Sequence, residues 1–218
     1  MCIRDRLLEG DVGKLKTDQA EFVTNIAQST KRMIDLVGSL LNISRLESGR
    51  IIVNPQPTNL AQLISVVVED LHTDLKSRHQ KLTIDIDPTL PSINLDERMV
   101  SQVYMNLLTN AIRYSPNGGE ISVKVRRDGD DILSEVKDSG YGIPADEQKK
   151  IFERFFRASN VMKIETDGTG LGLYLIKIIV DSSGGRVWFK STEGKGTTFS
   201  FTLPVKGMEA HKGDVQLD

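Results

Sequence analysis

Residues 106–114 read Asn-Leu-Leu-Thr-Asn-Ala-Ile-Arg-Tyr, and the fold and the chemistry of the chain can be worked out from this stretch. Asn106 and Asn110 are four residues apart, so both amides lie on one face of a helix. The apolar residues between them would face a core, and an amide beside a core is costly unless it is bonded. Amide oxygens suit a hard cation such as magnesium. The two asparagines therefore predict a ligand site. The alternative is that they lie on the surface and bind nothing.

Helices and strands alternate around this stretch. A short strand at 93–96 leads to Asp96, which can cap a helix that ends by Ser115-Pro116. Further helices are expected at 60–75 and 173–181, and further strands at 82–86, 121–125, 132–136, 187–190 and 198–203. The sequence thus predicts an α+β fold, with one mixed, mostly antiparallel sheet and helices on one of its faces.

A long helix is expected before this domain. The helix is expected over residues 7–48, with Gly49 as its end. Its apolar residues recur in steps of four and three from Phe22 to Ile43, which is typical of a coiled-coil or bundle seam. A lone helix cannot bury such a stripe, so a partner helix is implied; packing back onto the main domain is the alternative. Pro55 and Pro57 mark a linker. The expected divisions are a hairpin remnant at 1–50, a main domain at 51–206 and a flexible polar tail at 207–218.

Two glycine-rich loops follow the asparagine helix. Asp138-Ser-Gly-Tyr-Gly-Ile143 ends a strand, and its carboxylate can accept a hydrogen bond from an exocyclic amine such as that of adenine. Alone this motif is weak, because many turns look like it. Gly168-Thr-Gly-Leu-Gly-Leu173 opens a helix, whose free N–H groups form an anion site. Its glycine spacing and the polar residues before it argue against a dinucleotide fingerprint, and the lysine of a P-loop is missing.

Between these loops, residues 152–157 read Phe-Glu-Arg-Phe-Phe-Arg. The aromatic side chains can anchor a mobile lid over about residues 158–167. Phe152 and Phe155 are expected to lie in the core whether or not the segment anchors a lid.

The composition excludes several other kinds of site. The chain has 218 residues, a net charge of −2, one cysteine and three histidines. A disulfide and a cysteine zinc site are therefore excluded, the histidines lack metal-site spacing, and the charge gives no reason to expect nucleic acid as a partner. We find no apolar run long enough to cross a membrane and no signal peptide, so we expect a cytoplasmic portion. Residues 1–6 fit no pattern, which leaves open whether they are native.

Taken in this order, the motifs resemble the N, G1, F and G2 boxes of the histidine-kinase branch of the GHKL ATPases, and residues 40–49 resemble the end of the kinase dimerisation hairpin. The resemblance covers about residues 7–204. It implies a Bergerat-type two-layer α/β sandwich that binds ATP and Mg2+. Phe156 stands where many relatives carry tyrosine.

The resemblance also assigns roles to individual residues. Asn110 would ligate magnesium, with Asn106 as a second candidate. Asp138 would bind the adenine amine with support from Thr197, and Arg113 and the second glycine loop would hold phosphates. The implied ATP-contacting residues are Asn106, Asn110, Arg113, Tyr114, Asp138, Gly140, Gly142, Ile143, Arg157, Gly168, Thr169, Gly170, Leu171, Gly172, Leu173 and Thr197.

By the same resemblance, the chain would donate the γ-phosphoryl group of ATP to a histidine, for relay to an aspartate of a response regulator. The acceptor box of the family, a His-Glu/Asp-Leu-Arg-like sequence, does not occur in this sequence; His72 and His79 come too late in the chain, and His211 lies in the tail. We therefore expect no self-phosphorylation, and the acceptor helix and a homodimer belong to the intact parent. Membrane anchoring of that parent, at the inner membrane, follows from the family only.

Two alternatives to a histidine kinase remain at this stage. One is an ATP-sensing or scaffold GHKL module without kinase turnover. The other is a GHKL ATPase that is not a histidine kinase, against which the residue 152–157 motif and the heptad helix argue.

Overall fold

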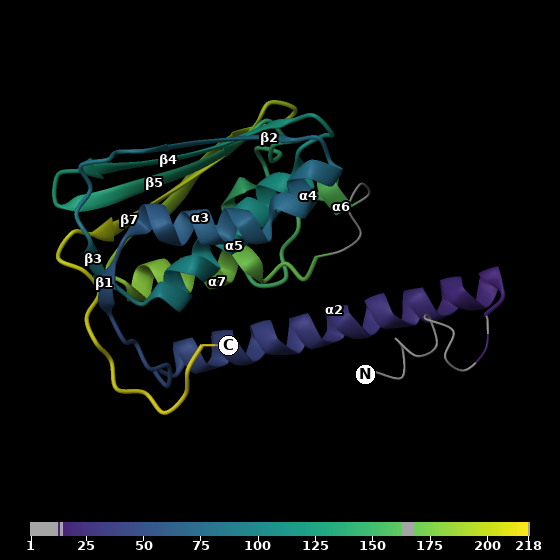
Figure 1. Cartoon of the computed structure of the whole chain (residues 1–218), viewed down its shortest axis with the longest axis horizontal. Coiled ribbons are helices and arrows are strands. Elements are labelled where there is room, and N and C mark those ends of the chain that lie inside the picture. The colour runs from purple at the N-terminus through teal and green to yellow at the C-terminus, as the bar shows by residue number, and fades with distance from the viewer. Residues whose placement is uncertain (1–12, 14, 163–167, 218) are drawn as a thin grey trace. The chain divides into compact units, whose positions relative to one another are not determined.

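The computed structural model describes residue 13 and residues 15–162 and 168–217 (Figure 1). The chain divides into two compact units, Met1–Leu41 and Asn42–Asp218. Within the described residues, the structure has no helix that combines the length and the apolar character needed to span a bilayer.

The long helix α2 runs from Thr17 to Glu47. The sequence predicted a helix from residue 7, which is wrong for the described residues before Thr17, because they are not helical. Gly13 has a φ of +110°, a left-handed value that a helix cannot continue; residues 7–12 and 14 lie outside the described residues. The predicted end is confirmed, since Gly49 adopts a φ of +65° just after the last turn.

The apolar stripe of α2 is largely exposed. Phe22 and Ile26 are 68% and 66% exposed, and Met33 is 59% exposed. An apolar helix face of this length in water is unusual for a folded monomer. That a partner covers it stays a prediction.

Within the described part of the chain, the main sheet has five strands in the order β2-β4-β5-β7-β6. β2 pairs with β4 in parallel, and the other pairs are antiparallel, which confirms the mixed, mostly antiparallel sheet. The strands are β2 (Lys81–Ile86), β4 (Glu120–Asp128), β5 (Asp131–Asp138), β6 (Val187–Thr192) and β7 (Gly196–Pro204).

The helices of this unit cover one face of the sheet (Figure 1). They are α3 (Leu60–Asp70), α4 (His72–Ser77), α5 (Glu97–Tyr114) and α7 (Gly172–Ser182). A small second sheet pairs β1 (Gln56–Thr58) with β3 (Ile93–Leu95). The single helix predicted at 60–75 is instead two helices, because the chain turns at Leu71 between α3 and α4.

Helix α5 forms the centre of the core. Asp96 caps its N-terminus through bonds from the Arg98 and Met99 amides, as predicted, which is worth about 1 kcal/mol. Its apolar face is almost completely buried, and Tyr104 is fully buried with its hydroxyl 2.6 Å from Ser134 Oγ. The helix ends at Tyr114, just before Ser115-Pro116, as predicted.

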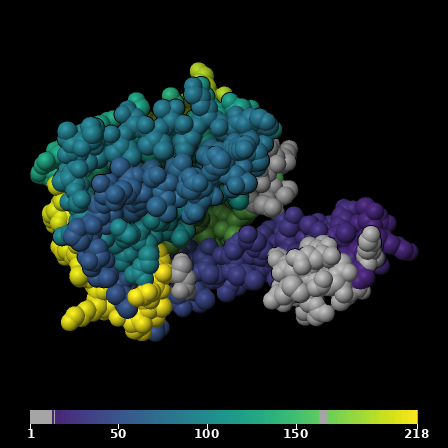
Figure 2. All heavy atoms as spheres, viewed as in Figure 1, coloured from purple at the N-terminus to yellow at the C-terminus, as the bar shows by residue number. Residues whose placement is uncertain are grey.

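The C-terminal segment packs against the chain just after α2. Isolated bridges join Val215 to Ile51 and His211 to Val53, and Arg50 forms an ion pair with Asp214. Met208 and Leu217 are buried, and Figure 2 shows the yellow tail beside the blue segment that follows α2. These contacts differ from the free tail that the polar composition predicted, because a few apolar side chains and backbone bonds suffice to hold it.

Candidate nucleotide-binding site

Asn106 projects from α5 toward the start of α7. Asn106 donates its amide hydrogen to the Gln102 carbonyl at 2.9 Å, which leaves its Oδ1 for another partner. That oxygen lies so close to α7 that a Cβ added to Gly172 would come within 2.9 Å of it. Asn110 is half-buried, and its side chain makes no hydrogen bond within the described residues. Two amide oxygens are therefore available on one face of the helix, which fits a hard cation.

Asp138 is the buried carboxylate of the site. It ends β5 and is 7% exposed. Its Oδ1 accepts hydrogen bonds from the Gly140 amide at 2.8 Å and the Thr197 amide at 3.1 Å. Neither bond involves Oδ2, so one oxygen of a fixed carboxylate is left to receive a donor. Burial raises the pKa of Asp138, and the two backbone hydrogen bonds oppose that rise.

The loop after Asp138 fits closely against the end of α5. A Cβ at Gly140 would lie 2.3 Å from the Tyr114 carbonyl oxygen, so only glycine allows this approach. The Tyr141 amide donates to the same carbonyl at 3.1 Å. Tyr114 and Arg113 are half-buried, and Ile143 is buried. The first glycine loop and the asparagine helix, which are separate in the sequence, are thus neighbours.

The second glycine loop leads directly into α7. Gly170 has a φ of +69°, and a Cβ there would lie 2.6 Å from the backbone carbon of Phe155. The Arg157 guanidinium lies 3.3 Å from the position of a Cβ at Gly168. Leu171 is fully buried and anchors the loop, while Thr169, Gly172 and Leu173 are half-buried. Free N–H groups at the start of an 11-residue helix favour an anion.

The aromatic segment at 152–157 differs from expectation. Phe152 packs edge-to-face on Phe189, with ring centroids 5.9 Å apart. The prediction that Phe155 lies in the core is wrong, because it is 57% exposed and its backbone has a φ of +61°. This left-handed turn points the side chain outward and brings the backbone against Gly170. Of the predicted lid, residues 158–162 are described and include the short helix α6 (Ser159–Met162), while 163–167 lie outside the described residues.

Several residues that hold the site were missed. Ser191 accepts from the Ile143 amide at 2.9 Å and lies 2.9 Å from the Thr197 hydroxyl. Asn160 donates to the Gly142 carbonyl at 3.0 Å, and Glu147 accepts from the Ser159 amide at 2.9 Å. A serine on an alternating strand carries no sequence signal for such a role, because the contact depends on the register of β6 against β7.

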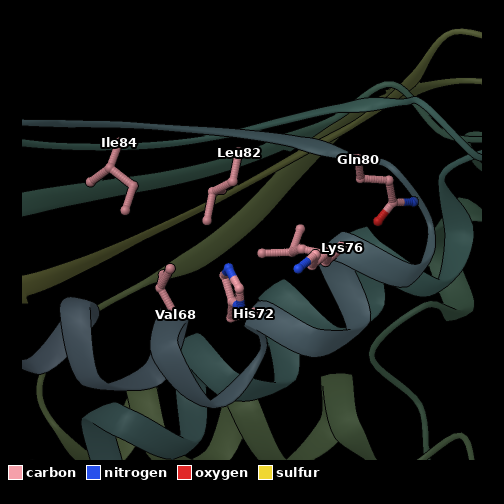
Figure 3. Close-up of a pocket in the computed structure, with 7 residues that line it drawn as sticks. Val68, His72, Lys76, Gln80, Leu82 and Ile84 are labelled. Atoms are coloured by element: carbon pink, nitrogen blue, oxygen red, sulfur yellow. The ribbon is translucent and has the colours of Figure 1, made fainter.

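A second hollow of about 360 Å³ lies between β2 and the helices α3 and α4 (Figure 3). Leu82 and Ile84 point down from the strand, and Val68 and His72 face them from the helices. None of the predicted nucleotide residues lines it. The residues that line this mostly apolar groove include neither a carboxylate nor a glycine.

Residues 95–207 match the family model described as histidine kinase-, DNA gyrase B-, and HSP90-like ATPase. This match covers more than half of the chain and includes the asparagine helix α5, both glycine loops and the segment 152–157. The chain belongs to this ATPase family.

Individual relatives are sensor kinases. The sensor histidine kinase WalK of Bacillus subtilis is 34% identical over 187 residues, which cover 85% of this chain but 30% of WalK. The chain therefore spans less than a third of this curated relative. The full-length structure of ShkA in complex with AMPPNP has a TM-score of 0.76 at 25% identity and covers 96% of this chain and 43% of ShkA.

The histidine kinase ThkA, solved in complex with the response regulator TrrA, shares the fold. Its TM-score is 0.71 at 21% identity, over 93% of this chain and 58% of that chain. The Bergerat-type sandwich expected from the sequence is therefore confirmed for this member of the ATPase family.

Proposed function

We propose that this chain is the ATP-binding catalytic region of a sensor histidine kinase, which transfers the γ-phosphoryl group of ATP to a protein histidine. The observation that carries the proposal is the buried Asp138 carboxylate. Two backbone amides hold its Oδ1, and Oδ2 remains for a donor, at the junction of the asparagine helix and the first glycine loop.

The adenine side of the site would be selected by Asp138. Its carboxylate accepts a hydrogen bond from the exocyclic amine, and a buried acceptor discriminates strongly against a purine that lacks this donor. Ile143 and Tyr114 offer apolar surface for the base, and Thr197 fixes the carboxylate through its amide. Ser191 supports Thr197 from the next strand.

The phosphate side would be formed by the second glycine loop and the start of α7. Backbone N–H groups there stabilise negative charge, and Arg113 and Arg157 would contribute guanidinium groups to the phosphates. Asn110, with Asn106 beside it, has the oxygen ligands for Mg2+. When bound, the ion neutralises phosphate charge. The protein's contribution to transfer is then mainly positioning and electrostatic stabilisation.

The histidine would come from another segment. No His-Glu/Asp-Leu-Arg-like box occurs in this sequence, and His72, His79 and His211 lie outside the described nucleotide contacts. The exposed stripe of α2 suits a second helix of an acceptor hairpin and, in the parent, a homodimer. ThkA was solved with a response regulator, which supports a regulator aspartate as the onward acceptor.

The proposal can be tested with a chimaera that carries the first hairpin helix of WalK before residue 17. We expect incubation with γ-labelled ATP to give acid-labile, base-stable label on the chimaera. Label should be absent from a chimaera with the acceptor histidine changed to alanine, from an Asp138→Asn chimaera and from the chain without the added helix. If the chimaera binds ATP but is never labelled, the chain is better described as an ATP-sensing or scaffold module.

A further inference from the structure

Three side chains from distant parts of the sequence meet beside the second glycine loop. Glu47 is the last residue of α2, Arg154 belongs to the aromatic segment at 152–157, and Tyr174 lies in the first turn of α7. The Glu47 carboxylate accepts hydrogen bonds from the Arg154 guanidinium and from the Tyr174 hydroxyl through the same oxygen, Oε1. The Arg154 guanidinium also donates to the Tyr174 hydroxyl at 2.9 Å.

The contacts among these three residues reinforce one another. The Arg154 guanidinium carbon lies 4.8 Å from the centre of the Tyr174 ring, a cation–π distance. The pKa of Glu47 is lowered, chiefly by the Tyr174 hydrogen bond and also by the hydrogen bond and charge of Arg154, while burial opposes the shift. The Arg154 and Glu47 side chains are 46% and 35% exposed, so water screens the pair and each contact is modest.

The cluster is connected to the loop through the backbone on both sides. Arg154 immediately precedes Phe155, whose left-handed backbone packs against Gly170. Tyr174 follows the loop by two residues, on the helix turn whose N–H groups face the proposed phosphates. A Cβ added to Gly172, the last residue of the loop, would lie 2.9 Å from Asn106 Oδ1. A displacement at Glu47 can therefore reach the loop from both of its flanks.

We propose that Glu47 is a positioning residue for the phosphate-binding loop Gly168–Gly172, which it holds through Arg154 and Tyr174. This inference rests on the proposed function, because it assumes that the loop binds the phosphates of ATP. A loop held in its bound arrangement loses less conformational entropy on binding. Glu47 thus sets the affinity for the phosphates and leaves the adenine pocket unaffected.

The test compares ATP with adenosine, which lacks the phosphates. Dissociation constants of both are measured by competition against a fluorescent ATP analogue. We expect Glu47→Gln, which keeps the shape of the side chain, to weaken ATP binding about three- to tenfold and to leave adenosine binding unchanged. Tyr174→Phe keeps the ring under Arg154 but removes the hydroxyl. It should have a smaller effect in the same direction, and the double variant should be no worse than Glu47→Gln alone.

Asp181→Asn is the matched control. It removes an acidic side chain that pairs with Lys177 four residues away, near the end of α7 far from the loop, so it should leave both affinities unchanged. Equal weakening of ATP and adenosine by Glu47→Gln, unchanged or tighter ATP binding, or independent effects of the two substitutions would each overturn the inference. Failure of the unmodified chain to bind ATP would instead reject the proposed function, which separates the two failures.

Discussion

The proposed adenine side and the proposed phosphate side of the site are built differently. Asp138 is buried at the end of a central strand, and two backbone amides hold it, one from the loop at Gly140 and one from Thr197 at the start of β7. The loop Gly168–Gly172 is half-exposed apart from Leu171, and surface side chains such as Arg154 and Glu47 hold its surroundings. Backbone hydrogen bonds in a core persist for as long as the protein stays folded. Exposed ion pairs, in contrast, are weak and can be changed without unfolding the protein. The comparison teaches that, on the proposed function, base recognition is part of the fold, while phosphate binding can be tuned from the surface.

The largest effect of a single substitution is expected on the adenine side, where Gly196→Ala should lower the stability of the protein. A Cβ there would lie 2.1 Å from the Asp138 carbonyl oxygen, and the residue has a φ of +98°. We expect the free energy of unfolding to fall by about 3 kcal/mol through clash and backbone strain. Urea unfolding followed by circular dichroism measures this.

Gly194→Ala is the control that introduces backbone strain without a steric clash of the added Cβ. Gly194 lies in the same turn with a φ of +75°, but a Cβ there would meet nothing within 4 Å. It should cost only about 1 kcal/mol. Similar losses for both variants would show that the close approach to Asp138 does not matter.

The second prediction concerns pH. Because burial raises the pKa of Asp138, its carboxylate takes up a proton at a higher pH than a free aspartate does. Adenosine affinity should fall as pH decreases through this raised pKa, by up to about tenfold per pH unit below it. Competition titrations between pH 7 and pH 4 measure the curve, and a flat curve would contradict the assignment.

Ionisation of Asp138 should have the opposite effect on the stability of the unliganded protein: it favours adenosine binding but lowers the free energy of unfolding. A carboxyl whose pKa is raised by folding contributes stability at low pH that is lost as pH rises through the folded pKa. Asp138→Asn, which cannot ionise, should therefore unfold at neutral pH no more easily than the unmodified chain. A large loss of stability would mean that the ionised carboxylate is needed for folding.

On the phosphate side we expect an intermediate effect from Gly170→Ala. The added methyl would displace the Phe155 backbone, which lies 2.6 Å away, and would disfavour the φ of +69°. ATP affinity should fall about tenfold as the loop shifts, with adenosine affinity unchanged. Equal losses for the two ligands would show that the two sides are not separable.

The smallest effect is expected from Asn110→Ala, which should change only the dependence of ATP affinity on Mg2+. The side chain has no hydrogen bond to lose within the described residues, so stability should hardly change. The gain in ATP affinity on adding Mg2+ should shrink about threefold or more. ATP titrations with Mg2+ and with EDTA measure it, with Asn117→Ala in the exposed turn after α5 as control. An unchanged response to Mg2+ would remove Asn110 as a ligand.

Much of the fold followed from the sequence where local rules act alone. Asp96 as a helix cap, Gly49 as a helix end and the asparagine face of α5 depend on spacing within one element. The strands could be predicted from alternating apolar residues, because one face of the sheet is buried against helices. Glycine at positions 140 and 170 could also be predicted to lie in tight loops, since glycine is required where backbones approach closely.

The rest could not be read from spacing, because it depends on contacts between elements. Phe155 looks like a core residue, yet a left-handed turn places it outside. Ser191 supports the carboxylate only through the β6–β7 register. The tail has a polar sequence, and its packing depends on bridges to Ile51 and Val53. Glu47 meets Tyr174 across 127 positions of sequence.

The most direct test of the account is a calorimetric titration of Mg–ATP into the purified chain and its Asp138→Asn variant. We predict saturable one-to-one binding to the unmodified chain and affinity about 10- to 100-fold weaker in the variant, because a hydrogen bond to a buried carboxylate is lost. Circular dichroism should show both proteins folded. Equal affinities, or no binding to a folded unmodified chain, would contradict the assignment of Asp138 and its surroundings as the nucleotide site.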